Sequence, residues 1–342
     1  MATSGVMTFR LNRDQIITQS LIKVGGLDPE STVGPSATQI TNAAINLNAM
    51  VKVWETKGLE LWERKYAVIF PQKGQGIYAL GTPGPGGDHA TLSNNLNVGS
   101  FLNTTLPSTV TVGSGTVTLS TITDNGTIGT PAYTILSGDN IGIEADDGTM
   151  YWFTVNGAPS GNTVTLSIPT TVNSSVGNTV YAYRTKLFRP LRVLAGFYRQ
   201  AAGNDVPIRI ISRDEYNLFG VKTSTGVPIQ AFYDPQTNTG LLEIYPQPVD
   251  VDGQLYIEIQ KPIEDFVTST DDFDFPQEWC EALIWGLARR LIPDYRTPPQ
   301  TASLIVQMAK ESEDTVTAWD QENTSMFLQP DESMYMNLRG NR

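Results

Sequence analysis

The sequence is poor in the side chains that most often build catalytic and metal sites. Its 342 residues include one cysteine, Cys280, and one histidine, His89. A single cysteine excludes a disulfide framework and a zinc site made of several cysteines. Cys280 falls within a helical pattern, where we expect it to be a small buried apolar residue. A Ser-His-Asp triad would have to use His89, which lies in a Gly/Pro-rich loop that we expect to be mobile.

Positive charge is also scarce, with 23 Lys and Arg against 35 Asp and Glu and a net charge of -12 at pH 7. Binding to phosphates needs clustered Lys and Arg, so a surface that grips DNA is disfavoured. An acidic wall would instead repel the phosphates and let DNA slide past. No apolar run approaches about 18 residues, so no membrane-spanning helix is expected. The first residues lack the apolar stretch of a signal peptide, and we expect synthesis in the cytoplasm.

Recognisable motifs of catalysis and metal binding are missing as well. The stretch GTPGPGG at 81–87 is followed by no Lys-Ser/Thr pair, so it is a linker rather than a phosphate-binding loop. HExxH, CxxC and a nucleophile elbow are absent from the sequence. The acidic group near Asp146 has the spacing of no calcium loop. We therefore expect no enzyme, no metal and no cofactor, although plentiful carboxylates leave a paired-carboxylate glycosidase open.

The middle of the chain lacks positive charge altogether. Between Lys73 and Arg184 there is no Lys or Arg, while Thr, Ser, Asn, Gly and Val dominate. Short alternating apolar runs follow one another, and Asp147-Gly148 between two of them is a strong hairpin signal. This pattern predicts an inserted all-β domain, a sandwich or partial barrel, over residues 85–184.

What the sequence does contain is helical periodicity near both ends. Asn12 or Asp14 can cap a first helix, and Gly25-Gly26 is expected to end it because glycine tolerates the left-handed conformation. A capping box at 36–39 opens a second, longer helix. The stretch after Pro276 is helical again, since proline suits a first helical turn.

Two late helices follow each other from that proline onward. Pro293 is expected to end the first of them. Thr297 with Gln300 predicts a capping box for the second, with Pro298 in its first turn. The apolar stripe of the second helix consists of Leu304, Ile305, Met308, Ser312, Thr315 and Trp319. Apolar stripes of this length fit a core helix pair of one domain or, in part, an interface with a neighbouring subunit.

Strand patterns fill the rest of the chain outside the insert. Alternation over 61–80 around a Gly-rich turn predicts a hairpin, as does the stretch 232–245. Ser212 can cap a short helical turn over residues 213–219. Strands with helices towards both ends of the sequence indicate the α+β class. We expect a helical core domain, formed by the N- and C-terminal helices with β-hairpins, over 1–84 and 185–322.

The C-terminal stretch 323–342 loses the helical period but keeps many apolar residues. Exposed apolar surface tends to bind something, so we expect an extended docking tail, with a disordered C-terminus as the alternative. The residues that suggest docking are Met326, Phe327, Met334, Tyr335, Met336 and Leu338.

Several stretches in a fixed order give the sequence a family resemblance. They are RDQIITQSLIKVGGLDPEST, RPLRVLAGFYR, VPIRIISRDEYNLF, GVPIQAFYDPQTNTGLLEIYPQP and DFDFPQEWCEALIWGLARRLIPDY. Taken together, the chain resembles the head-to-tail adaptor proteins of short-tailed bacteriophages, also called head-completion or tail accessory factors. The resemblance covers roughly 10–82 and 186–322, and the insert is extra to the smallest members.

This resemblance implies a structural virion protein at the head-tail interface, assembled in the host cytoplasm. A homo-oligomeric, dodecameric ring would bind beneath the portal protein and connect it to the nozzle or tubular tail protein. DNA would pass through the central channel without specific binding, and no membrane is involved.

The resemblance also assigns roles to residues. The ring wall would be the stripes of 40–54, 279–291 and 304–319, with Leu304, Met308, Thr315 and Trp319 at the subunit interface. The tail would contact the portal through an apolar anchor with basic neighbours. These portal-contact residues are Met334, Tyr335, Met336, Leu338, Arg339 and Arg342.

Two other functions remain open at this point. The chain could be a virion protein that binds a glycan or receptor through the β-insert, because the insert is rich in Thr and Ser and almost free of charge. It could also be a peptidoglycan hydrolase, although no motif in the sequence favours lysis.

Overall fold

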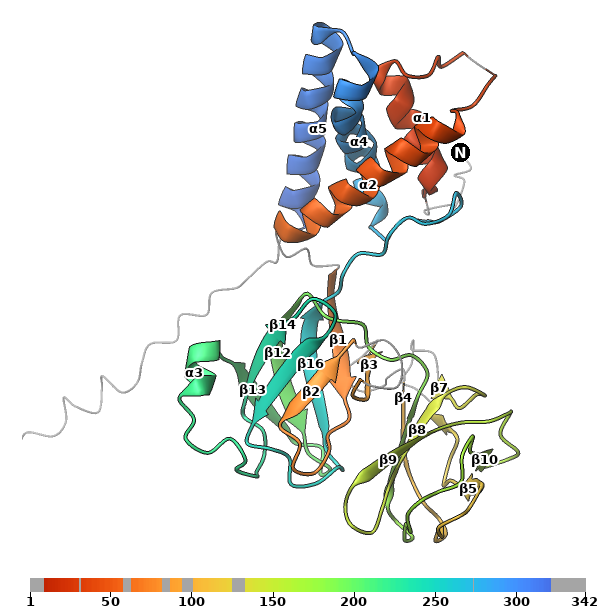
Figure 1. Cartoon of the computed structure of the whole chain (residues 1–342), viewed down its shortest axis with the longest axis vertical. Helices are drawn as coiled ribbons and strands as arrows, with labels where there is room; N and C mark the ends of the chain where they lie inside the picture. The colour runs from red at the N-terminus through yellow and green to blue at the C-terminus, as the bar shows by residue number, and fades with distance from the viewer. Residues whose placement is uncertain are drawn as a thin grey trace, which may run out of the picture. The chain divides into compact units, whose positions relative to one another are not determined.

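The computed structural model describes residues 9–30, 32–57, 63–81, 87–93, 101–124, 133–272 and 274–320. The chain divides into two compact units: a helical unit, Met1–Met50 with Phe266–Arg342, and a strand unit, Val51–Asp265 (Figure 1). This mixture of helix and sheet agrees with the expected α+β class. The two units nevertheless group the chain differently from the expected domains, because the strands outside the insert lie with the insert rather than with the helices.

Four α-helices make up the described part of the helical unit, and the division between the two units falls within the second. They are α1 (Arg13–Val24), α2 (Ala37–Lys57), α4 (Cys280–Tyr295) and α5 (Pro299–Trp319), with a short 3-10 helix, η2 (Gln277–Trp279), leading into α4. Helix α4 packs against both α1 and α5. In the described part of the chain, no helix is long and apolar enough to cross a bilayer. Side chains that the helical unit buries completely include Ile16, Ile17, Leu21, Leu47, Leu283 and Leu287.

The predicted signals at the starts of α1 and α2 are confirmed. Asn12 and Gln15 form a capping box at the start of α1, and Gly25 ends this helix in the left-handed conformation with a φ of 78°. At α2, the Gln39 N–H donates to Ser36 Oγ at 3.3 Å, and the Ser36 N–H donates to Gln39 Oε1 at 2.9 Å. These signals are local, so the sequence alone specifies them.

The predicted boundaries of α4 and α5 are wrong. Helix α4 continues through Pro293 and ends at Tyr295, with Arg296 as its C-cap. A proline so near the end removes only one backbone hydrogen bond, while Leu291 keeps its buried position. Thr297 makes no capping box, and its hydroxyl donates instead to the Val24 carbonyl at 3.1 Å. Because α5 starts with prolines that lack an N–H, it needs fewer capping partners.

The strand unit contains one eight-stranded sheet in the order β2-β15-β14-β13-β12-β16-β1-β3. All neighbours are antiparallel except β13 and β14. The predicted 232–245 hairpin is confirmed as β14 with β15, and Ser212 caps α3 (Arg213–Asn217) as expected. The strands are β1 (Arg64–Ile69), β2 (Ile77–Leu80), β3 (Ala90–Ser93), β12 (Arg192–Arg199), β13 (Asp205–Ile210), β14 (Gln230–Pro235), β15 (Gly240–Tyr245) and β16 (Gln254–Gln260).

The hairpin predicted over 61–80 is wrong, because β1 and β2 do not pair with each other. Strand β1 pairs with β16 and β3, whereas β2 pairs with β15 at the other end of the sheet order. Asp88 connects the two ends: its N–H donates to the Ala79 carbonyl at 3.0 Å, and its carboxylate accepts the Ala79 N–H at 2.6 Å. The sheet is therefore nearly closed.

The inserted strands form sheets of their own. A four-stranded sheet has the order β4-β11-β8-β9, and two small sheets pair β10 with β5 and β6 with β7. The Asp147-Gly148 hairpin is confirmed as β8 with β9. Residues 90–93, at the start of the expected insert, belong instead to the eight-stranded sheet as β3. The inserted strands are β4 (Phe101–Thr105), β5 (Thr116–Thr118), β6 (Thr123–Asp124), β7 (Tyr133–Thr134), β8 (Asn140–Glu144), β9 (Met150–Thr154), β10 (Thr163–Thr165) and β11 (Thr179–Tyr183).

Candidate functional site: an aromatic seam and a helical groove

Strand β11 contributes side chains to two separate hydrophobic clusters. Val180 and Ala182 point into the core of the insert, and Tyr181 and Tyr183 lie on the opposite face, as the period of two in a strand requires. The two tyrosines meet residues of the eight-stranded sheet in a cluster that we name the aromatic seam. It comprises Val68, Phe70, Phe101, Met150, Tyr181, Tyr183, Val251 and Tyr256, with Trp152 and Phe197 packed against it.

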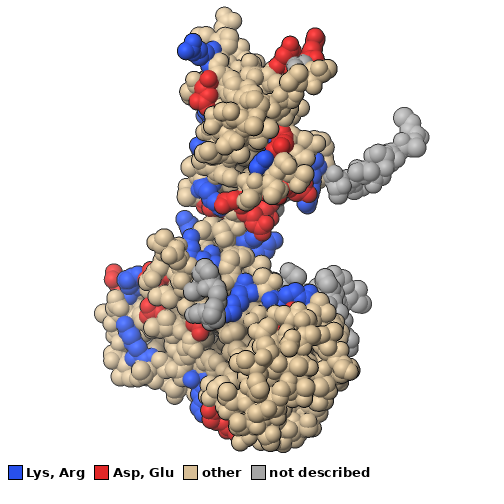
Figure 2. All heavy atoms as spheres, turned by 45° about the vertical axis from the view of Figure 1, so that its right-hand side comes forward, with Lys and Arg blue, Asp and Glu red and all other residues tan. Residues whose placement is uncertain are grey.

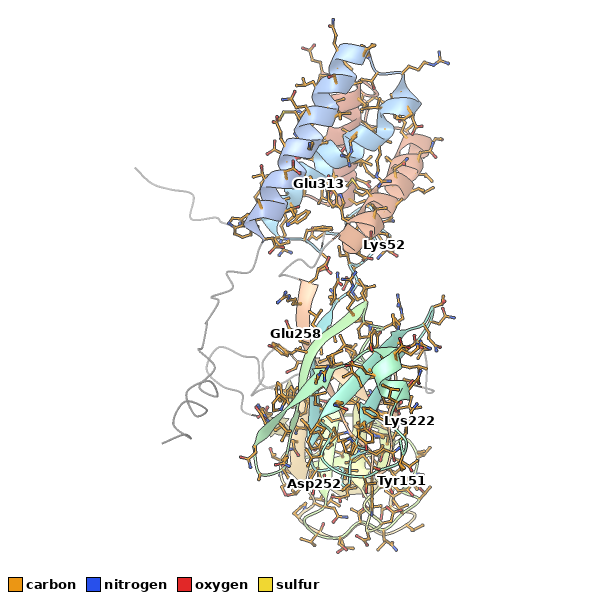
Figure 3. All side chains as sticks on the ribbon, turned by 90° about the vertical axis from the view of Figure 1, so that its left-hand side faces the viewer. Lys52, Tyr151, Lys222, Asp252, Glu258 and Glu313 are labelled. Atoms are coloured by element: carbon orange, nitrogen blue, oxygen red, sulfur yellow. The ribbon has the colours of Figure 1, made fainter. Side chains whose placement is uncertain are left out.

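Polar contacts reinforce the aromatic seam. The Gln72 amide donates from Nε2 to the Met150 carbonyl at 2.6 Å and accepts the Met150 N–H at 2.9 Å, so it matches both backbone groups of that residue. The Tyr181 hydroxyl donates to the carbonyl of Asp252, a residue labelled in Figure 3, at 3.0 Å. The insert is therefore held by a packed and hydrogen-bonded interface rather than by its connections alone.

His89 lies in this seam rather than in a mobile loop. Its ring stacks on Trp152 with a centroid separation of 3.8 Å, and its Nδ1 is 2.7 Å from the Tyr183 hydroxyl. Burial, and then the charge of Lys186, lower the pKa of His89 to about 3. A neutral histidine held between two aromatic side chains is a structural group. In the described parts of the chain, no cluster of His, Cys, Asp and Glu could hold a metal ion.

On α5, the predicted subunit-interface residues lie on the outward side. Leu304 is 54% exposed and Trp319 is 67% exposed; Thr315 is exposed and Met308 is half-buried. Of the six residues in the predicted stripe, Ile305 alone is fully buried. The inward face consists instead of Ile305, Ala309 and Val316.

Three of these predicted residues line a groove of about 400 Å³ between α4 and α5. Met308, Thr315 and Trp319 lie along it, and the buried Ala282 and Val316 add apolar surface. Among the described residues, the lining consists of Glu278, Glu281, Ala282, Met308, Glu311, Ser312, Thr315, Val316 and Trp319.

The groove is acidic. Glu281 accepts a hydrogen bond from the Trp285 indole at 3.3 Å, and Glu311 accepts one from the Gln307 amide at 2.8 Å. These donors are neutral, so they leave the negative charge of the carboxylates in place. Elsewhere between the same helices, Arg289 and Glu313 form an ion pair at 3.6 Å (Glu313 is labelled in Figure 3).

The other predicted sites divide into two groups. The α4 stripe is buried, and so are Leu47, Val51 and Trp54 of the α2 stripe. Of the three expected wall stripes, α5 therefore has the most exposed large apolar residues. The portal-contact residues, Met334 to Arg342, lie outside the described residues. The aromatic seam was not predicted, although the alternation in TVYAY at 179–183, with aromatic residues at every second position, was a signal for it.

Comparison of the sequence with known families places these surfaces in context. The sequence model described as SU10 adaptor protein matches residues 145–327, which is more than half of the chain. The chain belongs to the SU10 adaptor protein family. It is therefore a phage adaptor, which is a structural protein. The match runs from the end of β8 through α5, so it takes in the seam strands β9 and β11 and the groove.

Comparisons with curated proteins and with solved structures add little to what the family match shows about this SU10 adaptor. No match was found among curated proteins. Among solved structures, the chain is similar to the VP16-VP17 complex of the two major capsid proteins of bacteriophage P23-77, at 13% identity over 58% of this chain and 74% of that chain, with a TM-score of 0.13. It is also similar to VP17, a capsid protein of the same phage, at 13% identity over 63% and 75%, with a TM-score of 0.11. Such low scores support no inference about fold.

Proposed function

We propose that this SU10 adaptor forms a ring, of twelve copies as the head-to-tail adaptor resemblance implies, beneath the portal in the virion and connects the portal to the tail. The supporting observation is the outward side of α5, where Leu304, Thr315 and Trp319 are exposed beside a groove. Large apolar residues at the surface of an otherwise well-buried helix pair suit contact with another subunit. The subunit interface would therefore include these residues and Met308.

Charge supports the passage of DNA through such a ring. The net charge of -12 disfavours tight binding to phosphates, so DNA would move through the channel without specific contacts. The same charge keeps separate copies soluble before assembly.

Substitutions on the two sides of α5 test the ring. The double variant Leu304→Ser/Trp319→Ser should fold normally, because both residues are exposed, but should form no ring when mixed with the portal protein. Val306→Ser is the matched control, since Val306 is 46% exposed on the opposite side of α5. Native mass spectrometry and negative-stain imaging give the number of copies. Rings of unchanged size in the double variant, or their equal loss in the control, would contradict the interface.

The C-terminal tail is the proposed contact with the portal. Met334, Tyr335, Met336 and Leu338 would provide its apolar anchor, and Arg339 and Arg342 its basic contacts. Deletion of 323–342 should abolish portal binding and leave the α5 surface intact. Portal binding by the truncated chain, measured by co-sedimentation, would remove this role from the tail.

A second candidate function uses the insert. The face of the insert turned to the viewer in Figure 2 carries few charged side chains, and Val112, Ile168 and Val176 are each more than half exposed. An uncharged surface rich in Thr and Ser suits hydrogen bonding to a neutral glycan. A glycan array probed with the whole chain tests this, and binding that Thr and Ser substitutions on the insert leave unchanged would rule it out.

A further inference from the structure

The α4–α5 groove lies where the described chain ends. Trp319, the last residue of α5, lines the groove, and Asp320 follows directly. Asp320 is 8% exposed, and its Oδ2 has no hydrogen-bond partner among the described residues. Asp320 does not itself line the groove, but a buried carboxylate without a partner is costly, so the end of α5 beside the groove suits a cation.

The groove itself suits a short segment with both apolar and basic side chains. Its floor includes Met308 and Val316, which would pack against apolar groups. Its rim carries Glu278, Glu281 and Glu311, and none of the described residues that line it is a Lys or Arg. Arginine forms charge-assisted hydrogen bonds with carboxylates of this kind.

The chain contains one such segment close by in sequence. Residues 334–342 read MYMNLRGNR, with four large apolar residues, two arginines and no Asp or Glu. The intervening residues 321–333 include Glu322, Asp331 and Glu332, which the acidic rim would repel. Charge complementarity therefore favours the segment 334–342 over the rest of the tail.

The tether between α5 and this segment has a suitable length. The 13 residues 321–333 would span about 20 Å as a flexible chain, and more than about 40 Å when extended. The lining residues of α5, from 308 to 319, extend over about 17 Å of helix. A short tether also gives an effective concentration on the order of millimolar, which favours the segment of the same chain over that of a second copy.

We propose that the segment 334–342 docks into the α4–α5 groove of its own chain. Its apolar residues cover Met308 and Trp319, and its arginines face the glutamate rim and Asp320. The docked segment hides part of the predicted subunit interface in the isolated chain, and a partner that captures the segment uncovers that interface. This regulation goes beyond the proposed adaptor function and does not depend on the portal.

Disulfide trapping in the full-length chain tests the docking. In a Cys280→Ala background, the pair Thr315→Cys/Leu338→Cys places one thiol in the groove and one in the segment. The matched control, Lys310→Cys/Leu338→Cys, places the first thiol on the opposite, exposed side of α5. We expect the groove pair to form an intrachain disulfide at least about tenfold faster than the control. A synthetic peptide of residues 334–342 should slow the reaction, and Glu278→Gln/Glu281→Gln/Glu311→Gln should slow it too.

Equal rates for the two pairs would overturn the docking, because they would show random encounter along the tether. Cross-linked dimers in place of cross-linked monomers would overturn it as well, because the segment would then occupy the groove of a second copy. Circular dichroism of each variant confirms that its helices are intact. The experiment contains no portal protein, so a negative result leaves the ring proposal untouched.

Discussion

At the residue scale, single polar side chains fix the insert to the eight-stranded sheet. Gln72 supplies both a donor and an acceptor to the backbone of Met150, which is 3% exposed. His89 fills the space between Trp152 and Tyr183 in its neutral form. The contacts of Gln72 and His89 could not be predicted from the sequence, because they join residues about 60 or more positions apart. The capping residues of α1 and α2, in contrast, were predictable because their partners lie three positions away.

Gln72→Ala should loosen the insert. The substitution leaves the buried N–H and carbonyl of Met150 unpaired, and each unpaired group costs about 1–3 kcal/mol. We expect the free energy of unfolding of the strand unit to fall by about 2–4 kcal/mol, measured by urea denaturation, with faster hydrogen exchange in β9. Gln236→Ala, in an exposed turn, is the control and should change it by less than about 0.5 kcal/mol. Equal effects of the two variants would show that the Gln72 contacts add nothing.

His89 should make the strand unit sensitive to acid. Its pKa is about 3 when folded, against an ordinary value of 6.5, so the stabilisation is complete above pH 6.5 and is lost as the pH falls towards 3. Between pH 7 and pH 5 this linkage removes about 2 kcal/mol. His89→Gln should lower stability at pH 7 yet show a decrease between pH 7 and 5 that is smaller by that amount, in urea titrations at both pH values. An unchanged pH dependence in His89→Gln would mean that the imidazole titrates normally in the folded chain.

At the element scale, α5 shows what hydrophobic periodicity predicts and what it misses. The period correctly predicted a helix over this stretch, although not its first residue. The predicted stripe mixed the two faces of the helix, because it placed the buried Ile305 together with Leu304 and Trp319, which are exposed. The helix instead packs through Ala309 with Ile305 and Val316, and small residues permit close contact between helices.

The end of α4 offers a test of local strain. Arg296 adopts the left-handed conformation with a φ of 49°, which costs a residue with a Cβ about 1 kcal/mol. Because Arg296 is exposed, Arg296→Gly should stabilise the helical unit by about 0.5–1 kcal/mol in thermal melts followed at 222 nm. Lys310→Gly, within α5, should instead destabilise it by about 1 kcal/mol. A lower melting temperature for Arg296→Gly would show that contacts of the Arg296 side chain outweigh the strain.

Strand pairing was less predictable than strand position. Turn signals near Gly74 suggested that β1 and β2 pair, but the two strands lie at different places in the sheet order. Alternation reports which residues face inward and carries no information about which strand lies alongside. The hairpins with tight turns, β8–β9 and β14–β15, were predictable because their geometry is local.

At the scale of the whole molecule, the insert and the sheet that bears it share one buried interface. The strand β1 sends Ala67 and Ile69 into the core of the eight-stranded sheet and Val68 into the aromatic seam. Both faces of β1 are thus covered. The compositional change at the insert predicted an all-β segment, but nothing in it indicated that the outer face of the neighbouring sheet would be apolar.

Removal of the insert should expose this face. Thr91 donates to the Thr185 carbonyl at 2.9 Å, so a short Gly/Ser linker can replace residues 94–184. We expect the shortened chain to aggregate, because Phe70, Phe197 and Tyr256 would lose their cover. Adding Phe70→Ser, Phe197→Ser and Tyr256→Ser should restore solubility, as judged by the soluble fraction and by size-exclusion chromatography. A soluble, monomeric shortened chain without these changes would contradict the role of the seam.

Asp88, which connects the two ends of the eight-stranded sheet, affects how copies of the chain can associate when many of them are close together. An open strand edge carries unpaired N–H and C=O groups that template the addition of strands from other chains. That hazard grows when many copies gather in a small space, as in a ring. Because the two backbone groups of Ala79 are already occupied by Asp88, strand-by-strand polymerisation is blocked at this point. Recognition between copies is left to side chains, whose pattern distinguishes the right neighbour from any other β protein.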